Sequence, residues 1–224
     1  MKVSVIIPAY NEEVFIGKCL ESIVNQEELP GEIIVVDNNS TDNTARIAGR
    51  MGVKVVKEKN QGLIFARNKG FDSARYEIIA RCDADVIVPT DWVKRIKYNF
   101  ETQNIDALSG PVLFYDSIIK SPLPVQIYSE SLKLLLRGNR ALLGPNMAVS
   151  KRIWKIVKPL VSLNDSLVHE DIDLSINILR AKGKIEYDAS LIVKTSARRI
   201  KKRPVSFFVE YPTRLLKTFW VNRA

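Results

Sequence analysis

The 224-residue sequence has few cysteines, one histidine and no long apolar run, and each shortage excludes a class of protein. Its two cysteines, Cys19 and Cys82, are too few for a disulfide framework. Both stand among apolar residues, where they should pack as small hydrophobic side chains. No apolar stretch approaches the roughly 18 residues that a membrane-spanning helix needs. The N-terminal run Val3–Ile7 is too short for the core of a signal peptide, so we expect a cytoplasmic protein.

Two phosphate-binding signatures are also absent. No G-x-G-x-x-G follows the first apolar run, and no G-x-x-x-x-G-K-[ST] occurs, which disfavours a dinucleotide-dependent dehydrogenase and a P-loop nucleoside triphosphatase. A phosphatase with an aspartyl nucleophile usually has paired aspartates after its first strand. Here the paired aspartates follow the fourth expected strand.

Positive charge is concentrated at the C-terminal end. The net charge is +9, and from Arg198 onward eight Lys or Arg residues stand against one acid, Glu210. The remainder is nearly neutral, so we expect a domain over 1–197, a basic tail over 198–224 and an anionic partner for that tail. The tail's bases are not interleaved with a known nucleic-acid motif, so we expect no nucleic-acid partner.

Apolar, β-branched runs alternate with segments of helical periodicity. Strands are expected over 2–7, 32–36, 53–56 and 78–81, with helices over 16–24, 44–51 and 63–74 between them. This alternation predicts an α/β fold with a mostly parallel sheet. Further on we expect helices over 90–101, within 121–137, over 151–157 and over 169–182, and strands over 107–114, 142–149 and 185–193. Gly183 should take the C′ position after the helix over 169–182.

The sequence argument centres on Ile78–Val88, an apolar strand that runs into Asp83 and Asp85. On an extended chain, residues two apart point the same way. Burying two charges would cost too much, so this pair should lie in a cleft, with a cation between it and an anionic group. Ligands bind at the carboxyl ends of parallel strands, where Tyr10, Asn11, Glu12 and Asp37 also follow strands. A solvated strand-to-loop turn is the alternative.

The ordered motifs of this chain resemble the inverting, nucleotide-sugar-dependent glycosyltransferases of family 2, which have the GT-A fold. The matching segments are Val5–Glu12, Ile34–Asp42, Asn60–Gly62, Ala66–Gly70, Asp83–Asp85, Gly144–Ala148 and Glu170–Leu174. The tail is not covered. The resemblance implies a Rossmann-like sheet flanked by helices. It also implies metal-dependent transfer of a sugar from a nucleotide-diphosphate sugar to a hydroxyl of a glycan or lipid-linked acceptor.

By this resemblance, the donor would bind at the carboxyl edge of the sheet. Asp83 and Asp85 would hold Mg²⁺ or Mn²⁺ on the donor diphosphate, because a hard divalent ion takes carboxylate and phosphate oxygens. Asp37 would accept a hydrogen bond from the base. The other substrate-binding candidates are Pro8, Tyr10, Glu12, Asn39, Arg67, Gly144, Asn146 and Glu170. A first-turn helix acid at Glu12 and a loop cap at Asp37 are the alternatives.

The resemblance makes Asp171 the catalytic base, which needs to reach the acceptor hydroxyl. Two first-turn helix acids, Glu170 and Asp171, are the alternative. Many relatives have a histidine after this pair, whereas the only histidine here, His169, precedes it. Arg198 and Arg199 are therefore candidates for binding the diphosphate, and a solvated basic run is the alternative.

The tail combines bases with an apolar stripe. Pro204 suits a helix start, and Phe208, Tyr211, Leu215 and Phe219 recur every four residues, with Leu216 and Trp220 beside them. This pattern predicts a helix lying on an anionic membrane surface, kinked or split at Pro212. Packing on the domain's own surface, or across a homodimer, is the alternative.

A nucleotidyltransferase with a similar sheet is the competing enzyme class. It would need a glycine-rich, basic loop after the first strand, but Ala9–Glu13 is acidic. A nucleic-acid-binding module that uses the basic tail is the third possibility, and a salt-dependent gel shift would reveal it. The motifs favour the glycosyltransferase.

Overall fold

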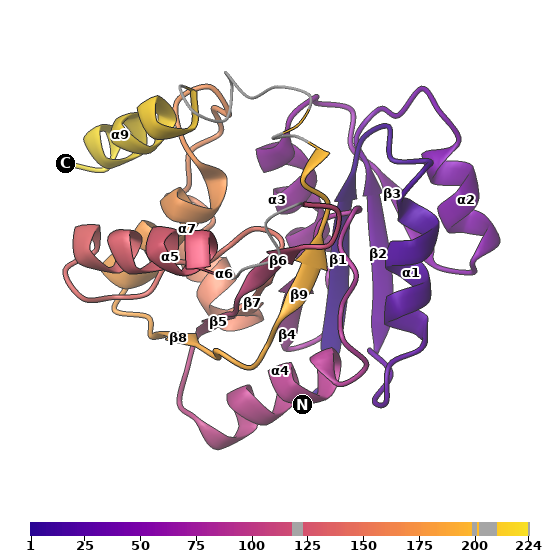
Figure 1. Ribbon diagram of the computed structural model, residues 1–224, viewed down its shortest axis with the longest axis horizontal. Coiled ribbons are helices and arrows are strands. Elements are labelled where there is room, and N and C mark those ends of the chain that lie inside the picture. The colour runs from indigo at the N-terminus through magenta and orange to yellow at the C-terminus, as the bar shows by residue number, and fades with distance from the viewer. Residues whose placement is uncertain (118–122, 199–200, 202–209, 224) are drawn as a thin grey trace.

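The computed structural model describes residues 1–117, 123–198, 201 and 210–223 (Figure 1). Its main sheet has seven strands in the order β3-β2-β1-β4-β7-β5-β8. These are β1 (Val3–Ala9), β2 (Glu32–Asp37), β3 (Lys54–Lys57), β4 (Ile78–Arg81), β5 (Ala107–Ser109), β7 (Met147–Ser150) and β8 (Ile185–Tyr187). Only β7 runs antiparallel to its neighbours, so the expected mostly parallel α/β sheet is confirmed. A second sheet pairs β6 (Val112–Phe114) with β9 (Val193–Thr195).

Helices cover both faces of the main sheet. The helices of the described residues are α1 (Ile16–Val24), α2 (Thr44–Arg50), α3 (Leu63–Ser73), α4 (Trp92–Thr102), α5 (Leu123–Leu135), α6 (Lys151–Val157), α7 (Glu170–Arg180) and α9 (Tyr211–Val221). Of these, α5 and α9 pack with α7 in a cluster of their own. Alternate residues of β1 enter different cores, as period-two strand geometry requires. Val5 and Ile7 pack in a core with residues of α1 and α4. Ile6 packs in another with residues of α3, α6 and α7.

The C-terminal helix α9 packs on the domain. A third apolar cluster joins α5, α7 and α9 (Figure 1). Leu215 and Phe219 of the predicted stripe are partly buried against this cluster, which includes Ile172 and Ile176 of α7. That half of the stripe therefore serves packing on the domain's own surface, which was the alternative to membrane contact. Of the other tail residues predicted to matter, Arg199, Pro204 and Phe208 lie outside the described residues.

Two local predictions were wrong. The expected strand over 107–114 is divided into β5, which pairs with β7 and β8 in the main sheet, and β6, which pairs with β9 in the second sheet. The left-handed residue after α7 is Lys182, with φ +60°, and not Gly183. Gly183 is needed for space, since a Cβ there would lie 2.8 Å from Ile178 Cγ2. Pro212 stands in the first turn of α9, where proline is tolerated, and the segment before Glu210 that it was expected to kink or split lies outside the described residues.

The cysteine prediction is confirmed. Cys19 and Cys82 are free and buried, with their sulfurs 4.0 Å apart. Among the described helices, none combines the length and apolarity needed to cross a bilayer.

Candidate active site

A cleft of about 190 Å³ opens where β1, β2 and β4 end. It is lined by Pro8, Ala9, Tyr10, Glu12, Asn38, Gln61, Gly62, Leu63, Ala66, Asp83, Ala84, Asp85 and Arg198. The loops that follow β1 and β2 are joined, since the Thr41 amide donates to Asn11 Oδ1 at 2.8 Å and the Asn11 amide to Ser40 Oγ at 3.1 Å. The ends of β1, β2 and β4 therefore lie together, as expected, and the loops that follow them line a cleft.

Asp85 and Glu12 share a cation in this cleft, namely Arg198. Asp85 Oδ2 accepts a hydrogen bond from Arg198 Nε at 3.0 Å, and Asp85 Oδ1 accepts one from Thr195 Oγ1 at 3.2 Å. Arg198 Nη2 pairs with Glu12 Oε1, and its guanidinium lies 4.4 Å from the centre of the Phe15 ring. Partial burial opposes the charge on Arg198, but the bond to Glu12 and the charge of Asp85 outweigh it and raise the pKa of Arg198.

Asp83 is joined to the predicted acceptor end by buried arginines. Arg81 Nη2 donates to Asp83 Oδ1 at 2.9 Å, and Arg81 Nη1 pairs with Glu170 Oε1. Arg67 Nη1 donates to Glu170 Oε2 at 2.9 Å and to the Glu170 carbonyl at 2.7 Å. Both guanidiniums are almost completely buried. Burial lowers the pKa of Arg67, whereas the charges of Glu170 and Asp83 outweigh burial at Arg81 and raise its pKa.

Asp171 lies in the first turn of α7, beside this network. Asp171 Oδ2 accepts a hydrogen bond from the Gly144 amide at 3.0 Å, and Asp171 Oδ1 accepts one from the Ile172 amide at 2.9 Å. Burial, with the charge of Glu170, raises the pKa of Asp171 above its usual value. A carboxylate of raised pKa is better suited to accept a proton near neutral pH.

His169 connects the start of α7 to α9. The His169 amide donates to Thr218 Oγ1 at 2.8 Å, and its Nε2 lies 2.9 Å from the Tyr211 carbonyl, which requires the proton on Nε2. Asn222 Nδ2 donates to Asp173 Oδ1 at 2.9 Å. The tail helix thus supports the turn that carries Asp171. Sequence reasoning missed this contact, and its only signal was a histidine directly before the acidic pair.

Two predicted substrate-binding residues are buried instead. Arg67 and Asn146 have no exposed surface. Asn146 accepts from Trp92 Nε1 at 2.9 Å and donates to the Leu191 carbonyl at 2.6 Å, so it ties α4 to the segment before β9. Direct substrate contact is therefore the wrong assignment for both side chains in this structure. Arg67 supports Glu170, and Asn146 holds the core together.

The other predicted residues occupy varied positions. Tyr10 lines the cleft and is 49% exposed, so its ring is open to a ligand. Asp37 is buried and accepts the Ser40 amide at 3.1 Å, which is the loop-cap contact named as its alternative. Asn39 has a left-handed φ of +63° and donates to the Lys59 carbonyl. At Gly144, a Cβ would lie 3.2 Å from Arg81 Nη2, so the buried network leaves little room for a side chain.

Pro8 also lines the cleft, within the central strand β1. It stands two residues past Ile6, the last residue of β1 that pairs with β4. Its missing N–H therefore interrupts no rung of that ladder, which explains how proline is accommodated there.

The donor set at the cleft suits a divalent ion that is shared with a substrate. Within residues 1–117, 123–198, 201 and 210–223, no three His, Cys, Asp or Glu side chains are grouped to enclose a metal. Asp83 and Asp85 offer carboxylate oxygens at the cleft. A hard ion such as Mg²⁺ or Mn²⁺ takes such oxygens together with phosphate oxygens and waters. The residues present therefore fit an ion completed by a phosphate ligand.

A larger surface hollow of about 950 Å³ lies elsewhere, lined in part by Met1, Glu101, Asp106 and Arg152. Its acids are already used, since Glu101 pairs with the N-terminal amine at 2.6 Å and Asp106 with Arg152. The cleft at the carboxyl ends of the strands is the better candidate because it gathers the motif residues.

Comparison with solved structures shows the fold. The mannosyltransferase PcManGT from Pyrobaculum calidifontis, in complex with GDP-Man and Mn²⁺, superposes with a TM-score of 0.75 and 21% identity over 99% of this chain and 64% of its own. The glucosyl-3-phosphoglycerate synthase from Mycobacterium tuberculosis, with Mn²⁺, UDP-Glc and phosphoglyceric acid, gives 0.70 and 20% over 97% and 79%. These similarities confirm the GT-A fold.

Comparison with sequences shows the family. An uncharacterized glycosyltransferase of Methanocaldococcus jannaschii is 28% identical over 241 residues, which cover 99% of this chain and 80% of the relative. Glycosyltransferase AglE of Haloferax volcanii is 33% identical over 120 residues, 50% of this chain and 40% of AglE, so the match spans less than half of that relative. Residues 4–152 match the model of Glycosyl transferase family 2. The chain therefore belongs to glycosyl transferase family 2 and contains a glycosyltransferase domain of that family.

Proposed function

We propose that this protein transfers a sugar from a nucleotide-diphosphate sugar to an acceptor hydroxyl, with inversion and with the help of a divalent ion. One observation carries the proposal. A single buried chain of contacts, from Asp83 through Arg81 to Glu170, joins the carboxylates expected at the donor diphosphate to the turn that carries Asp171. Similar folds bound to GDP-Man or UDP-Glc with Mn²⁺ support a donor of this class.

In this proposal, the residues at the two ends of the site have different roles. Asp171 would take the proton of the acceptor hydroxyl while the acceptor oxygen bonds to the anomeric carbon and the bond from that carbon to the diphosphate breaks. Glu170, fixed between two arginines, would hold Asp171 in place. An ion held by Asp83 and Asp85, when bound, would supply positive charge for the departing diphosphate. Arg198 would add a second positive charge at the same place.

Product analysis separates this reaction from nucleotidyl transfer. Sugar transfer releases a nucleoside diphosphate, whereas a nucleotidyltransferase consumes a nucleoside triphosphate and releases pyrophosphate. Incubation with UDP- and GDP-sugars plus Mn²⁺ should release the nucleoside diphosphate. Pyrophosphate release from a nucleoside triphosphate and a sugar phosphate, with sugar nucleotides left intact, would assign the other class.

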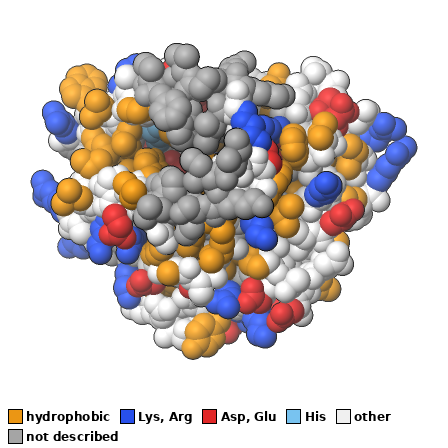
Figure 2. All heavy atoms as spheres, viewed as in Figure 1, with side chains coloured by type: hydrophobic (Ala, Val, Ile, Leu, Met, Phe, Trp, Pro, Cys, Tyr) orange, Lys and Arg blue, Asp and Glu red, His pale blue; other side chains and the backbone are white. Residues whose placement is uncertain are grey.

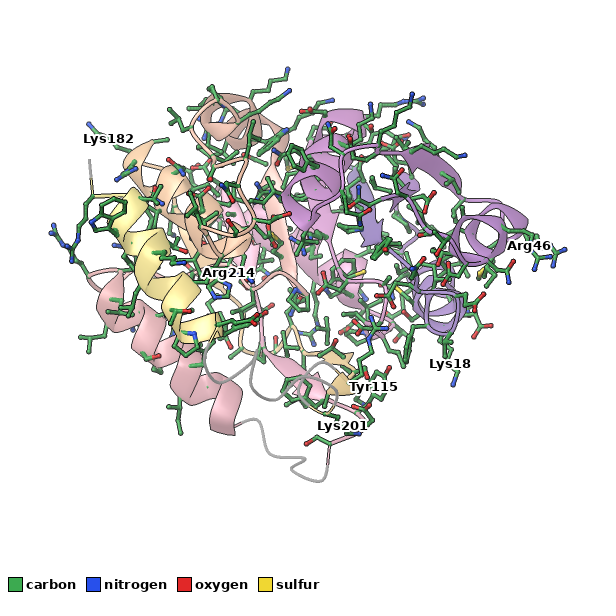
Figure 3. The ribbon with its side chains drawn as sticks, turned by 90° about the horizontal axis from the view of Figure 1, so that it is seen from above. Lys18, Arg46, Tyr115, Lys182, Lys201 and Arg214 are labelled. Carbon is green, nitrogen blue, oxygen red and sulfur yellow. The ribbon has the colours of Figure 1, made fainter. Side chains whose placement is uncertain are left out.

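The outer face formed by α5 and α9 supports a membrane-linked acceptor. The most exposed apolar side chains on these two helices are Ile127, Leu134, Leu135, Leu216 and Trp220, each more than half exposed. Figure 2 shows apolar groups at this end of the molecule, and Figure 3 shows the two helices side by side, with Arg214 on α9. We propose that this face, named here the α5/α9 face, rests on an anionic membrane, because exposed apolar groups beside bases suit a bilayer interface.

Vesicle flotation tests the membrane contact. Trp220→Ser with Leu216→Ser should abolish binding to vesicles that contain phosphatidylglycerol, because both side chains are 71% exposed and contribute little to the fold. Leu160→Ser, at a 55% exposed residue that follows α6 and belongs to neither α5 nor α9, is the matched control and should bind like the native protein. The membrane role would be contradicted if native protein does not bind anionic vesicles at low salt. It would also be contradicted if native protein forms a dimer through the α5/α9 face.

A further inference from the structure

Arginine, and not solvent, neutralises the acids of the cleft. Asp85 and Glu12 both contact Arg198, and Asp83 contacts Arg81. The two arginines differ in freedom. Arg81 is buried in β4, whereas Arg198 retains 21% of its side-chain exposure and lines the cleft wall. Only Arg198 is placed so that its side chain can turn away without disturbing the core.

The backbone that carries Arg198 is anchored independently of its guanidinium. Asp116 accepts the Ala197 amide at 2.6 Å and Ser196 Oγ at 2.9 Å, and Ser196 Oγ in turn accepts the Arg198 amide at 3.2 Å. These bonds involve neither Asp85 nor Glu12. The guanidinium can therefore exchange partners while residues 196–198 stay in place.

We propose that Arg198 competes with the divalent ion for Asp85, so that the free protein binds the ion weakly and takes it up together with the donor. The proposal rests on the proposed function, since it concerns the same site. An ion arriving alone must displace the guanidinium from Asp85 and then lie beside a guanidinium that keeps Glu12 but has lost Asp85 as a partner. The positive charges of the ion and of Arg198 repel each other, and the repulsion is stronger where water is excluded from the cleft.

A donor removes this conflict. The diphosphate offers Arg198 a new anionic partner, and guanidinium groups bind phosphate oxygens in paired hydrogen bonds. The diphosphate replaces the bonds that Arg198 loses to Asp85 and Glu12, and the ion takes the place of Arg198 at Asp85 Oδ2. Arg198 would thus have opposite effects on the affinity for the ion and on the affinity for the nucleotide. It weakens binding of the ion alone and strengthens binding of the nucleotide.

Arg198→Gln separates these two effects. Titration with Mn²⁺ alone, followed by the electron paramagnetic resonance signal of free Mn²⁺, should show affinity about tenfold higher than that of the native protein, a change worth about 1.4 kcal/mol. With Mn²⁺ saturating, UDP or GDP should bind about tenfold more weakly. Lys194→Gln removes the same charge from an exposed residue on β9 and should change both affinities by less than about twofold.

The Mn²⁺ titration decides the proposal by itself. Equal or lower Mn²⁺ affinity in Arg198→Gln, or no measurable binding in that variant, would overturn the competition. Should Arg198→Gln fail to fold, Arg198→Met retains a stem that can lie on Phe15 and makes the same comparison. Failure of UDP and GDP to bind native protein with Mn²⁺ would count against the proposed function, and the Mn²⁺ comparison would still judge the role of Arg198.

Discussion

Replacing Arg81 by leucine should destabilise the protein and uncouple the two ends of the active site. Arg81 is 1% exposed and pairs with Asp83 and Glu170. Removal of one partner from a buried ion pair costs about 3–5 kcal/mol, because the remaining charge is left uncompensated. Here Arg67 stays on Glu170, which places the expected cost at the lower end, about 3 kcal/mol. For a chain of this size, that loss lowers Tm by about 6–12 °C.

Calorimetry measures the effect, and a triple substitution isolates its cause. Glu170 also compensates the buried Arg67, so Arg81→Leu, Arg67→Leu and Glu170→Leu together remove all three buried charges and should recover part of the lost Tm. Exposed Lys94, paired at 3.2 Å with exposed Glu27, is the control, and Lys94→Leu should shift Tm by less than about 3 °C. An Arg81→Leu protein with native Tm and native nucleotide affinity would refute the idea that this network holds the site.

Further predictions concern the site and its support. Asp171→Asn should leave UDP or GDP binding intact while turnover falls by roughly 10²–10⁴, as measured by nucleoside diphosphate release. The raised pKa of Asp171 implies that ionised Asp171 destabilises the fold, so Asp171→Asn should have a higher Tm than native protein at pH 7, and the difference should vanish at pH values low enough to protonate the carboxyl in both states. Asp83→Ala with Asp85→Ala should abolish Mn²⁺-dependent nucleotide binding, and undiminished binding in calorimetry would contradict their role. Thr218→Val leaves the buried His169 amide without its acceptor, so it should cost about 1–3 kcal/mol of stability in urea unfolding and reduce turnover more than donor affinity.

The alternation of apolar runs and helical segments was enough to predict the sheet, because parallel strands buried on both faces are recognisable along the chain. The carboxyl edge was equally predictable from the two aspartates that follow a strand, although Asp85 is buried there, which its ion pair with Arg198 permits. The contacts beneath that edge were not. Arg81 and Arg67 pair with a residue 89 and 103 positions away, and nothing local distinguishes a buried arginine from an exposed one.

A residue's position in a family motif gave a wrong prediction where that residue is buried in the core. Asn146 lies in a matching segment, yet it bonds the Trp92 indole and two carbonyls in the interior. The tail stripe was visible as a four-residue repeat, but the repeat alone does not say which surface covers it. Leu215 and Phe219 pack against the apolar cluster between α5 and α7, while Trp220 remains exposed.

The most direct test of the account is the release of nucleoside diphosphate from UDP- and GDP-sugars, with Mn²⁺ and a glycolipid or simple sugar as acceptor. Native protein should release nucleoside diphosphate only when Mn²⁺ is present, and Asp85→Ala should reduce the release to background because the ion loses its carboxylate. Release by native protein that survives removal of Mn²⁺ by a chelator, or release by Asp85→Ala at the native rate, would contradict the proposed site.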